Sequence, residues 1–148
     1  MNFSRLAVAA VVTWTVDTIY GYVVFGVLLA NQFAAYPAVF RPMADVNANL
    51  PLLLGGSLVG MFALAYIYAK GYEGGSGAQE GMRFGTLIGL FGIAYVSIGQ
   101  YATMNIGPRI AAITGVAGFI EFVIDGIVLG VVYKPAAHAS ARSRAAER

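Results

Sequence analysis

The sequence contains no cysteine, and its only histidine is His138. Without cysteine the chain cannot form a disulfide, use a thiol nucleophile or hold a cysteine-ligated zinc or iron–sulfur site. Because the single histidine follows the last apolar run, an axially ligated haem or a histidine-rich metal site between the apolar segments is not expected. The sequence therefore predicts no cofactor and no metal.

Charged residues are also scarce, at 11% of 148 residues against 59% hydrophobic residues. An ordinary soluble domain is about one quarter charged. Four apolar runs each approach the roughly 20 residues that a membrane-spanning helix needs. They cover about 6–30, 51–69, 84–104 and 110–133. The sequence predicts an all-α integral membrane four-transmembrane-helix bundle, formed as one domain by residues 1–135.

The basic residues predict how the four spans are oriented. An even number of spans places both termini on one side, and Lys and Arg concentrate on the cytoplasmic side of a membrane. We therefore expect cytoplasmic termini and a basic, mobile cytoplasmic tail at 136–148. Three arginines in that tail without aromatic partners give no support for nucleic-acid binding. The expected cytoplasmic set is Arg5, Lys70, Arg83, Lys134, Arg142, Arg144 and Arg148, and the opposite set is Arg41 and Arg109.

Two loops differ in composition. The first outer loop, 31–49, is long and rich in aromatic residues. That composition favours a segment lying on the outer membrane surface, and a lid over an external opening is the alternative. The inner loop, 71–81, is rich in glycine and resembles a flexible linker between the second and third spans.

Three acidic residues lie within the predicted spans, where an ionisable group costs roughly 2.5 to 3.5 kcal/mol on insertion. Asp17 is in the first span, and Glu121 and Asp125 are in the fourth. The spacing of four places the last two on one helical face, which Thr114 and Gly118 extend into a polar stripe. Such a stripe must face protein or water.

The three acids lie at similar depths, so they can meet if the first and last helices are neighbours. Thr13, Trp14 and Tyr20 lie near Asp17 at helical spacings and, together with Thr114 on the fourth span, are candidate supporting residues. We expect Trp14 to pack in the core, with its indole nitrogen bonded to a nearby acid.

No lysine or arginine lies in the middle of a predicted span. Desolvation and like-charge repulsion then favour the protonated form of a carboxyl group. These features predict a proton or cation site at Asp17, Glu121 and Asp125, used in proton- or cation-coupled transport or permeation. The alternative is a non-catalytic accessory or structural subunit of a larger membrane complex, in which the acids join helices or meet a partner's basic residue. An enzyme is less favoured, because no nucleophile constellation or metal motif accompanies the acids.

The second and third spans match when residues 56–72 are placed over 85–101. A weaker offset aligns the first span with the fourth and pairs Asp17 with Asp125. An inverted repeat of helix pairs, as in transporters, is one explanation, and a chance likeness of apolar helices is the other. Small residues four apart let helices pack closely in the bundle, in a homo-oligomer or against other membrane subunits. The candidates are Gly56 and Gly60, then Gly81, Gly85 and Gly89, then Gly126 and Gly130.

Two adjacent segments carry a family resemblance: YIYAKGYEGGSG at 66–77 and EGMRFGTLIGL at 80–90. With them the chain resembles a group of uncharacterised small bacterial four-helix integral membrane proteins, which have no settled activity. The resemblance implies the four-helix fold and a bacterial inner membrane. The chain is also similar to small multidrug exporters in its helix count and in a first-span acid, here Asp17 instead of glutamate. It departs from them in its charge bias, its long outer loop and the acids on its last span.

Overall fold

The computed structural model describes residues 1–133, which form helices and connecting loops and contain no strand. Four helical units are long and apolar enough to cross a membrane: Phe3–Leu28, Leu50–Gly71, Gly77–Thr103 and Pro108–Val132. The all-helical architecture with four such units agrees with the sequence analysis. The predicted basic tail at 136–148 lies outside the described residues.

The first and third units each combine an α-helix with a π-helical segment. The elements in chain order are α1 (Phe3–Gly21), η1 (Tyr22–Leu28), α2 (Ala30–Ala34), α3 (Met43–Ala48), α4 (Leu50–Gly71), α5 (Gly77–Phe91), η2 (Gly92–Ser97), α6 (Ile98–Thr103) and α7 (Pro108–Val132).

Prolines stand in the first turn of two of the long helices. Pro51 stands in the first turn of α4 and Pro108 in the first turn of α7, where the missing N–H costs no helical hydrogen bond. Helix α5 begins earlier than its apolar run suggests, at Gly77 rather than Phe84. The first turns of α5 are therefore made by part of the glycine-rich segment that was expected to be a flexible linker.

The most extensive helix contact joins α5 to α7. Glycines on both helices allow it: a Cβ atom added at Gly81 would overlap the carbonyl oxygen of Gly126, and one at Gly126 would lie 2.7 Å from the Cα of Gly85. At Gly89 an added Cβ would lie 2.7 Å from the ring of Phe119. Backbones this close are typical of small-residue seams between membrane helices. The predicted packing roles of Gly85, Gly89, Gly126 and Gly130 agree with this contact.

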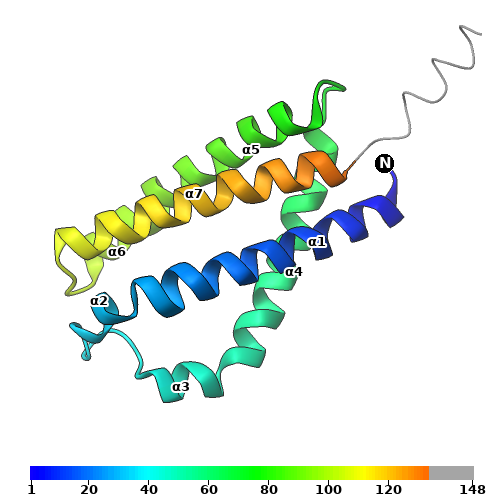
Figure 1. Cartoon of the computed structure of the whole chain (residues 1–148). Coiled ribbons are helices and arrows are strands. Elements are labelled where there is room, and N and C mark those ends of the chain that lie inside the picture. The colour runs from blue at the N-terminus through cyan, green and yellow to red at the C-terminus, as the bar shows by residue number, and fades with distance from the viewer. Residues whose placement is uncertain (134–148) are drawn as a thin grey trace, which may run out of the picture.

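Helix α7 also packs against α1, and α1 packs against α4. Helices α1, α5 and α7 run roughly alongside one another, and α4 crosses them steeply (Figure 1). An apolar cluster fills the junction of α1, α4 and α7 near the N-terminus. Its buried members are Leu6, Ala9, Ala10, Met61, Ala65, Tyr68, Leu129 and Tyr133.

The first half of α4 has little cover from the rest of the described chain. A Cβ added at Gly55, Gly56 or Gly60 would meet no heavy atom within 4 Å. Among residues 1–133, Gly56 and Gly60 therefore form no packing seam, unlike Gly85 and Gly89, with which the sequence repeat aligns them. The two halves of the proposed repeat pack differently.

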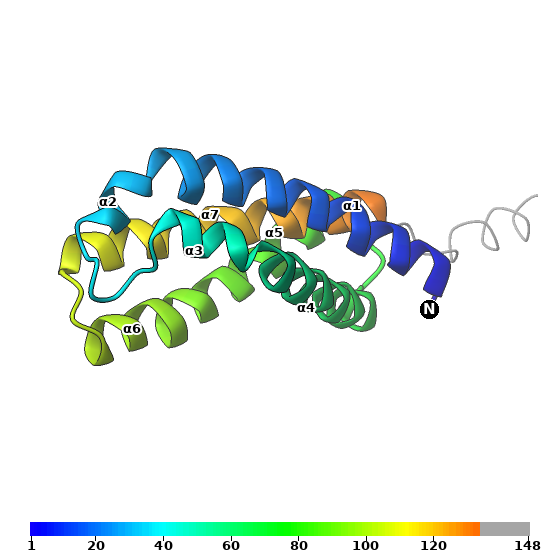
Figure 2. The same ribbon diagram turned by 90° about the horizontal axis from the view of Figure 1, so that it is seen from below.

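The outer loop is folded, with two short helices and a series of aromatic contacts. Phe33 packs against Phe25 and Phe40, whose ring centroids lie 6.5 and 4.9 Å from its own. The hydroxyl of Tyr36 would lie 2.7 Å from a Cβ at Gly107, so the loop contacts the start of α7. Helices α2 and α6 lie at the same end of the molecule, opposite the N-terminus (Figure 2).

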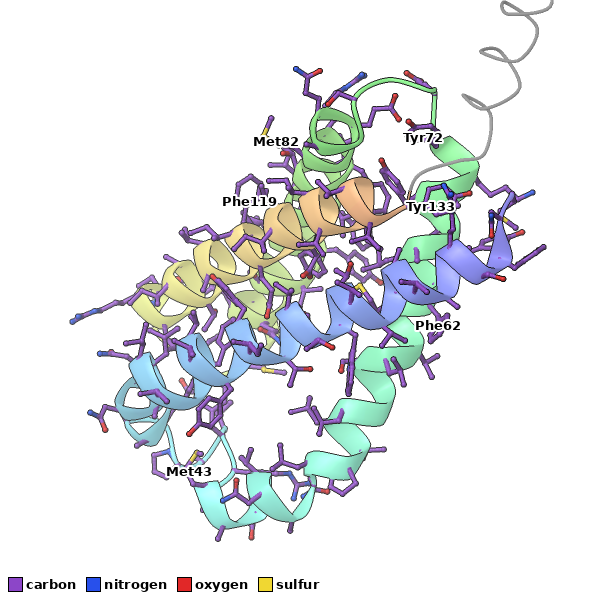
Figure 3. All side chains as sticks on the ribbon, turned by 45° about the vertical axis from the view of Figure 1, so that its right-hand side comes forward. Met43, Phe62, Tyr72, Met82, Phe119 and Tyr133 are labelled. Atoms are coloured by element: carbon purple, nitrogen blue, oxygen red, sulfur yellow. The ribbon has the colours of Figure 1, made fainter. Side chains whose placement is uncertain are left out.

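The loop between α4 and α5 is held by Glu80. Its carboxylate accepts hydrogen bonds from the backbone N–H groups of Gly75 and of Glu73, the latter at 3.2 Å. Tyr72 donates to the carbonyl of Gly75 at 2.9 Å, and its ring lies 6.3 Å from that of Tyr133 (Figure 3). Burial and the charge of Glu80 raise the pKa of Tyr72, so its hydroxyl remains a donor at neutral pH.

The contact between α5 and α7 predicts a position-dependent cost of adding one methyl group. Gly81→Ala places that group against the Gly126 backbone, which cannot move aside, and should cost about 1–3 kcal/mol or more. Gly60→Ala is the matched control, because its Cβ enters open space. Thermal unfolding in detergent, followed by circular dichroism, should show a lower melting temperature for Gly81→Ala alone. Equal melting of the two variants would contradict the packing.

Candidate functional site

The candidate site lies where α1 passes α7. Two contacts set the register: the Tyr20 hydroxyl donates to the carbonyl of Ala117 at 2.9 Å, and a Cβ at Gly21 would lie 3.6 Å from Oε1 of Glu121. Closer to the N-terminus of α1, the same two helices meet in the apolar cluster that contains Leu129. Their chain directions are therefore opposite, and the middle of α1 faces the middle of α7.

This register brings together the three acids that the sequence singles out. The side chains of Asp17 and Asp125 approach each other across the two helices. Glu121 lies close enough to Asp17 and Asp125 for its charge to act on both. The ring of Tyr20 lies beside Glu121 and Asp125. We call Asp17, Glu121 and Asp125 the carboxylate cluster.

Asp125 is the most buried member of the carboxylate cluster, with 2% of its surface exposed, whereas Asp17 and Glu121 are half-buried. Both Asp125 carboxyl oxygens lack a donor among the described residues. An ionised carboxylate can only accept hydrogen bonds, so two ionised aspartates cannot bond to each other. A hydrogen bond between Asp17 and Asp125 would therefore require a proton on one of them, which the two would then share.

Thr13 lies one turn before Asp17 on α1 and is completely buried. Its hydroxyl has no hydrogen-bond partner among the described residues, and neither has that of Thr18. Other helical threonines in this chain bond to the carbonyl four residues earlier: Thr15 to Val11 at 2.9 Å, and Thr114 to Ile110 at 2.8 Å. Thr13 thus carries an unused polar group at the site, whereas Thr114, a predicted supporting residue, is satisfied within its own helix.

Trp14 faces a different neighbour from the one expected. Its indole N–H is shared between the carbonyl of Leu54, at 3.2 Å, and Oγ of Ser57, at 2.9 Å. The predicted bond from Trp14 to an acid is therefore wrong, and its role is to join α1 to α4. On a helix, the side chain of Trp14 points about 100° away from that of Thr13 and about 60° away from that of Asp17. It therefore reaches α4, which packs on that side of α1.

The surroundings of the carboxylate cluster supply little polar compensation. On the side toward the N-terminus, the apolar cluster around Leu129 separates the acids from the end of the helices. The basic residues of the long helices, Arg5, Lys70, Arg83 and Arg109, all lie within about two turns of a helix end. Among residues 1–133, no group of three histidine, cysteine or acidic side chains is arranged to hold a metal ion.

The sequence did not predict that α4 contributes residues to this region. Ser57 and the Leu54 carbonyl hold Trp14, but a serine in an apolar helix carries no signal of its partner. The buried hydroxyl of Thr18 was also missed, because Thr18 lies beside Asp17 in sequence without sharing its helical face.

No protein-family model, curated protein or solved structure matches the chain. The resemblance to small bacterial four-helix proteins and the weaker one to multidrug exporters therefore stay predictions. The case for a function depends on the geometry of the carboxylate cluster.

The shared proton predicts different outcomes for two substitutions of Asp125. Asp125→Asn keeps the shape and offers an N–H that can donate to Asp17, so unfolding should stay near the wild-type temperature. Asp125→Ala removes the bond and should lose roughly 1–3 kcal/mol. Circular-dichroism melts of both variants in the same detergent provide the comparison. If Asp125→Asn lowers the melting temperature as much as Asp125→Ala does, the contact between Asp17 and Asp125 does not depend on a hydrogen atom between them.

Proposed function

We propose that this chain is a small bacterial inner-membrane protein with four spans, which uses its carboxylate cluster for proton- or cation-coupled transport or permeation. The exposed surface of the long helices supports membrane insertion. Leu52, Val59 and Tyr95 have 76%, 71% and 74% of their surfaces exposed, and water would not favour so apolar a face. The basic residues support cytoplasmic termini.

The main support for the proposal is the burial of Asp125. A carboxyl group with both oxygens unpaired and 2% exposure is costly to maintain, and ionisable groups inside spans commonly mark proton or ion pathways. A purely structural acid would be expected to have its oxygens satisfied by fixed donors. Here its neighbours are Asp17 and Glu121, which can exchange protons with it.

The proposed coupling of protons to cations follows from the combined charge of Asp17 and Asp125. With one shared proton, Asp17 and Asp125 together carry one negative charge, and removal of that proton leaves two. The second negative charge is strongly unfavourable in an apolar interior unless a cation compensates it. Proton release and cation entry are therefore coupled by electrostatics, which is the basic requirement of an exchange mechanism.

The proposal predicts that neutral amides in the carboxylate cluster abolish flux without unfolding the protein. In liposomes loaded with a pH-sensitive dye, Asp125→Asn and Glu121→Gln should lower proton movement under an imposed gradient roughly tenfold or more. Asp45→Asn, in the outer-loop helix α3, makes the same chemical change away from the carboxylate cluster and should retain flux. Wild-type protein that moves no proton under a pH or cation gradient would refute the transport proposal.

A non-catalytic accessory or structural subunit is the second candidate, and the uncovered half of α4 favours it. A Cβ added at Gly55, Gly56 or Gly60 would meet no heavy atom of the described residues within 4 Å, so this side of α4 is open. Such a surface could receive a helix from a second copy of this chain or from another membrane subunit.

Purification from native membranes in mild detergent separates the two candidates. The accessory role predicts that the chain travels with other membrane subunits in fixed proportion, identified by mass spectrometry. A self-contained transporter predicts a single protein species, monomeric or homo-oligomeric, that retains flux after reconstitution.

A further inference from the structure

We infer that a pocket between the end of α4 and the start of α5 binds the headgroup of a phospholipid that carries both a phosphate and a primary amine. Arg83 binds the phosphate, and Glu73 binds the amine. The inference rests on the membrane placement in the proposed function and is independent of transport through the carboxylate cluster.

The pocket lies beside the loop that joins α4 to α5, where Tyr72 is labelled in Figure 3. The rings of Tyr68 and Phe84 both line it, with their centroids 5.4 Å apart. Its volume is about 260 Å³. Sites that enclose a whole drug-sized ligand usually have ~300 to 1,000 Å³. The pocket therefore has room for a headgroup and not for an entire lipid.

The lining of the pocket changes from charged to apolar along the helices. On α5, Arg83 is followed by Phe84 and, about 6 Å further along the helix axis, by Leu87. On α4, Ile67 lies one turn before the end of the helix. Leu87 and Ile67 have 67% and 53% of their surfaces exposed, so the apolar side of the pocket opens to the outside of the bundle. A headgroup beside the loop with acyl chains along this apolar side matches that order.

Two opposite charges in the pocket have no partner. The Arg83 guanidinium and the Glu73 carboxylate make no hydrogen bond or ion pair in residues 1–133, either with each other or with another group. Glu80 also lines the pocket, but its carboxylate accepts from the backbone N–H groups of Glu73 and Gly75. Glu80 thus fixes the loop that carries Glu73 and leaves one cation and one anion available to a ligand.

The combined charge of the pocket selects between headgroups. Glu73, Glu80 and Arg83 sum to minus one, which opposes a headgroup whose only charge is its phosphate. A phosphate accepts the forked N–H groups of an arginine, and a primary ammonium donates hydrogen bonds to a carboxylate. A choline group has no N–H to donate. Phosphatidylethanolamine therefore satisfies both Arg83 and Glu73, whereas phosphatidylcholine and phosphatidylglycerol each leave Glu73 without a donated hydrogen bond from an ammonium group.

The test is lipid binding to the full-length, delipidated protein in detergent, followed by native mass spectrometry. Phosphatidylethanolamine, phosphatidylcholine and phosphatidylglycerol with identical chains are titrated separately, and phosphatidylethanolamine should bind most tightly. Arg83→Gln removes the charged donor and should weaken its binding roughly tenfold. Arg109→Gln makes the same change at the start of α7, away from the pocket, and should bind as wild type.

Glu73→Gln tests the amine contact separately from the phosphate contact. The variant keeps Arg83, so it should still bind phospholipid, but phosphatidylethanolamine should lose its advantage over phosphatidylcholine. Binding of phosphatidylglycerol should rise, because the pocket loses one negative charge. Both substituted side chains are exposed, so both variants should fold, and circular-dichroism melts check this.

Three results would overturn the inference. The first is equal binding of the three lipids, or tighter binding of phosphatidylglycerol, by the wild-type protein. The second is an unchanged lipid preference in folded Arg83→Gln and Glu73→Gln. The third is soluble phosphoethanolamine that binds as tightly as the lipid, which would assign the pocket to a free solute. None of these results bears on proton flux in liposomes, whereas recovery of the protein outside the membrane fraction of cells would refute the membrane placement itself.

Discussion

The fold depends on a constraint at the contact of α1 with α7, where carboxyl groups from two helices share an apolar interior. Asp17 and Asp125 can bond only if a proton lies between them. A proton held in this way would join the two helices and set the charge of the site. Since a second negative charge there would need compensation, the helix contact and the ionisation state are linked.

The two flanks of this contact differ in how tightly they are packed. On one flank, the glycines of α5 let its backbone lie against that of α7, so α7 has little freedom to shift. On the other, α1 is joined to α4 by the shared bond of Trp14 and by the apolar cluster around Met61 and Ala65. The first half of α4 is open. Any movement that accompanies a change at the carboxylate cluster is therefore easier for α1 and α4 than for α5 and α7.

Much of this arrangement could be read from residue spacing. The four-residue interval from Glu121 to Asp125, and the matching depth of Asp17, predict the meeting of the acids once α1 and α7 are neighbours. The glycine interval likewise predicts the seam at Gly85. Residue spacing could not predict that Gly56 has no packing partner among the described residues, because that depends on the steep angle at which α4 crosses the other helices. Nor could it assign Trp14 to Ser57 or show that α5 starts at Gly77, since tertiary contacts decide both.

The offset that aligns the first span with the fourth pairs Asp17 with Asp125, and these two residues meet in the folded chain. In an antiparallel helix pair, equivalent positions face each other only near a two-fold axis between the helices. Because every antiparallel pair has one such position for a given offset, the meeting of Asp17 with Asp125 does not by itself separate a relation between the spans from chance composition. The offset also aligns Trp14 with Phe122, but these two residues have different neighbours. Trp14 bonds to α4, whereas the backbone of Phe122 lies directly against Gly85 of α5. The carboxylate cluster therefore lies between a tightly packed contact of α7 with α5 and the less covered contact of α1 with α4.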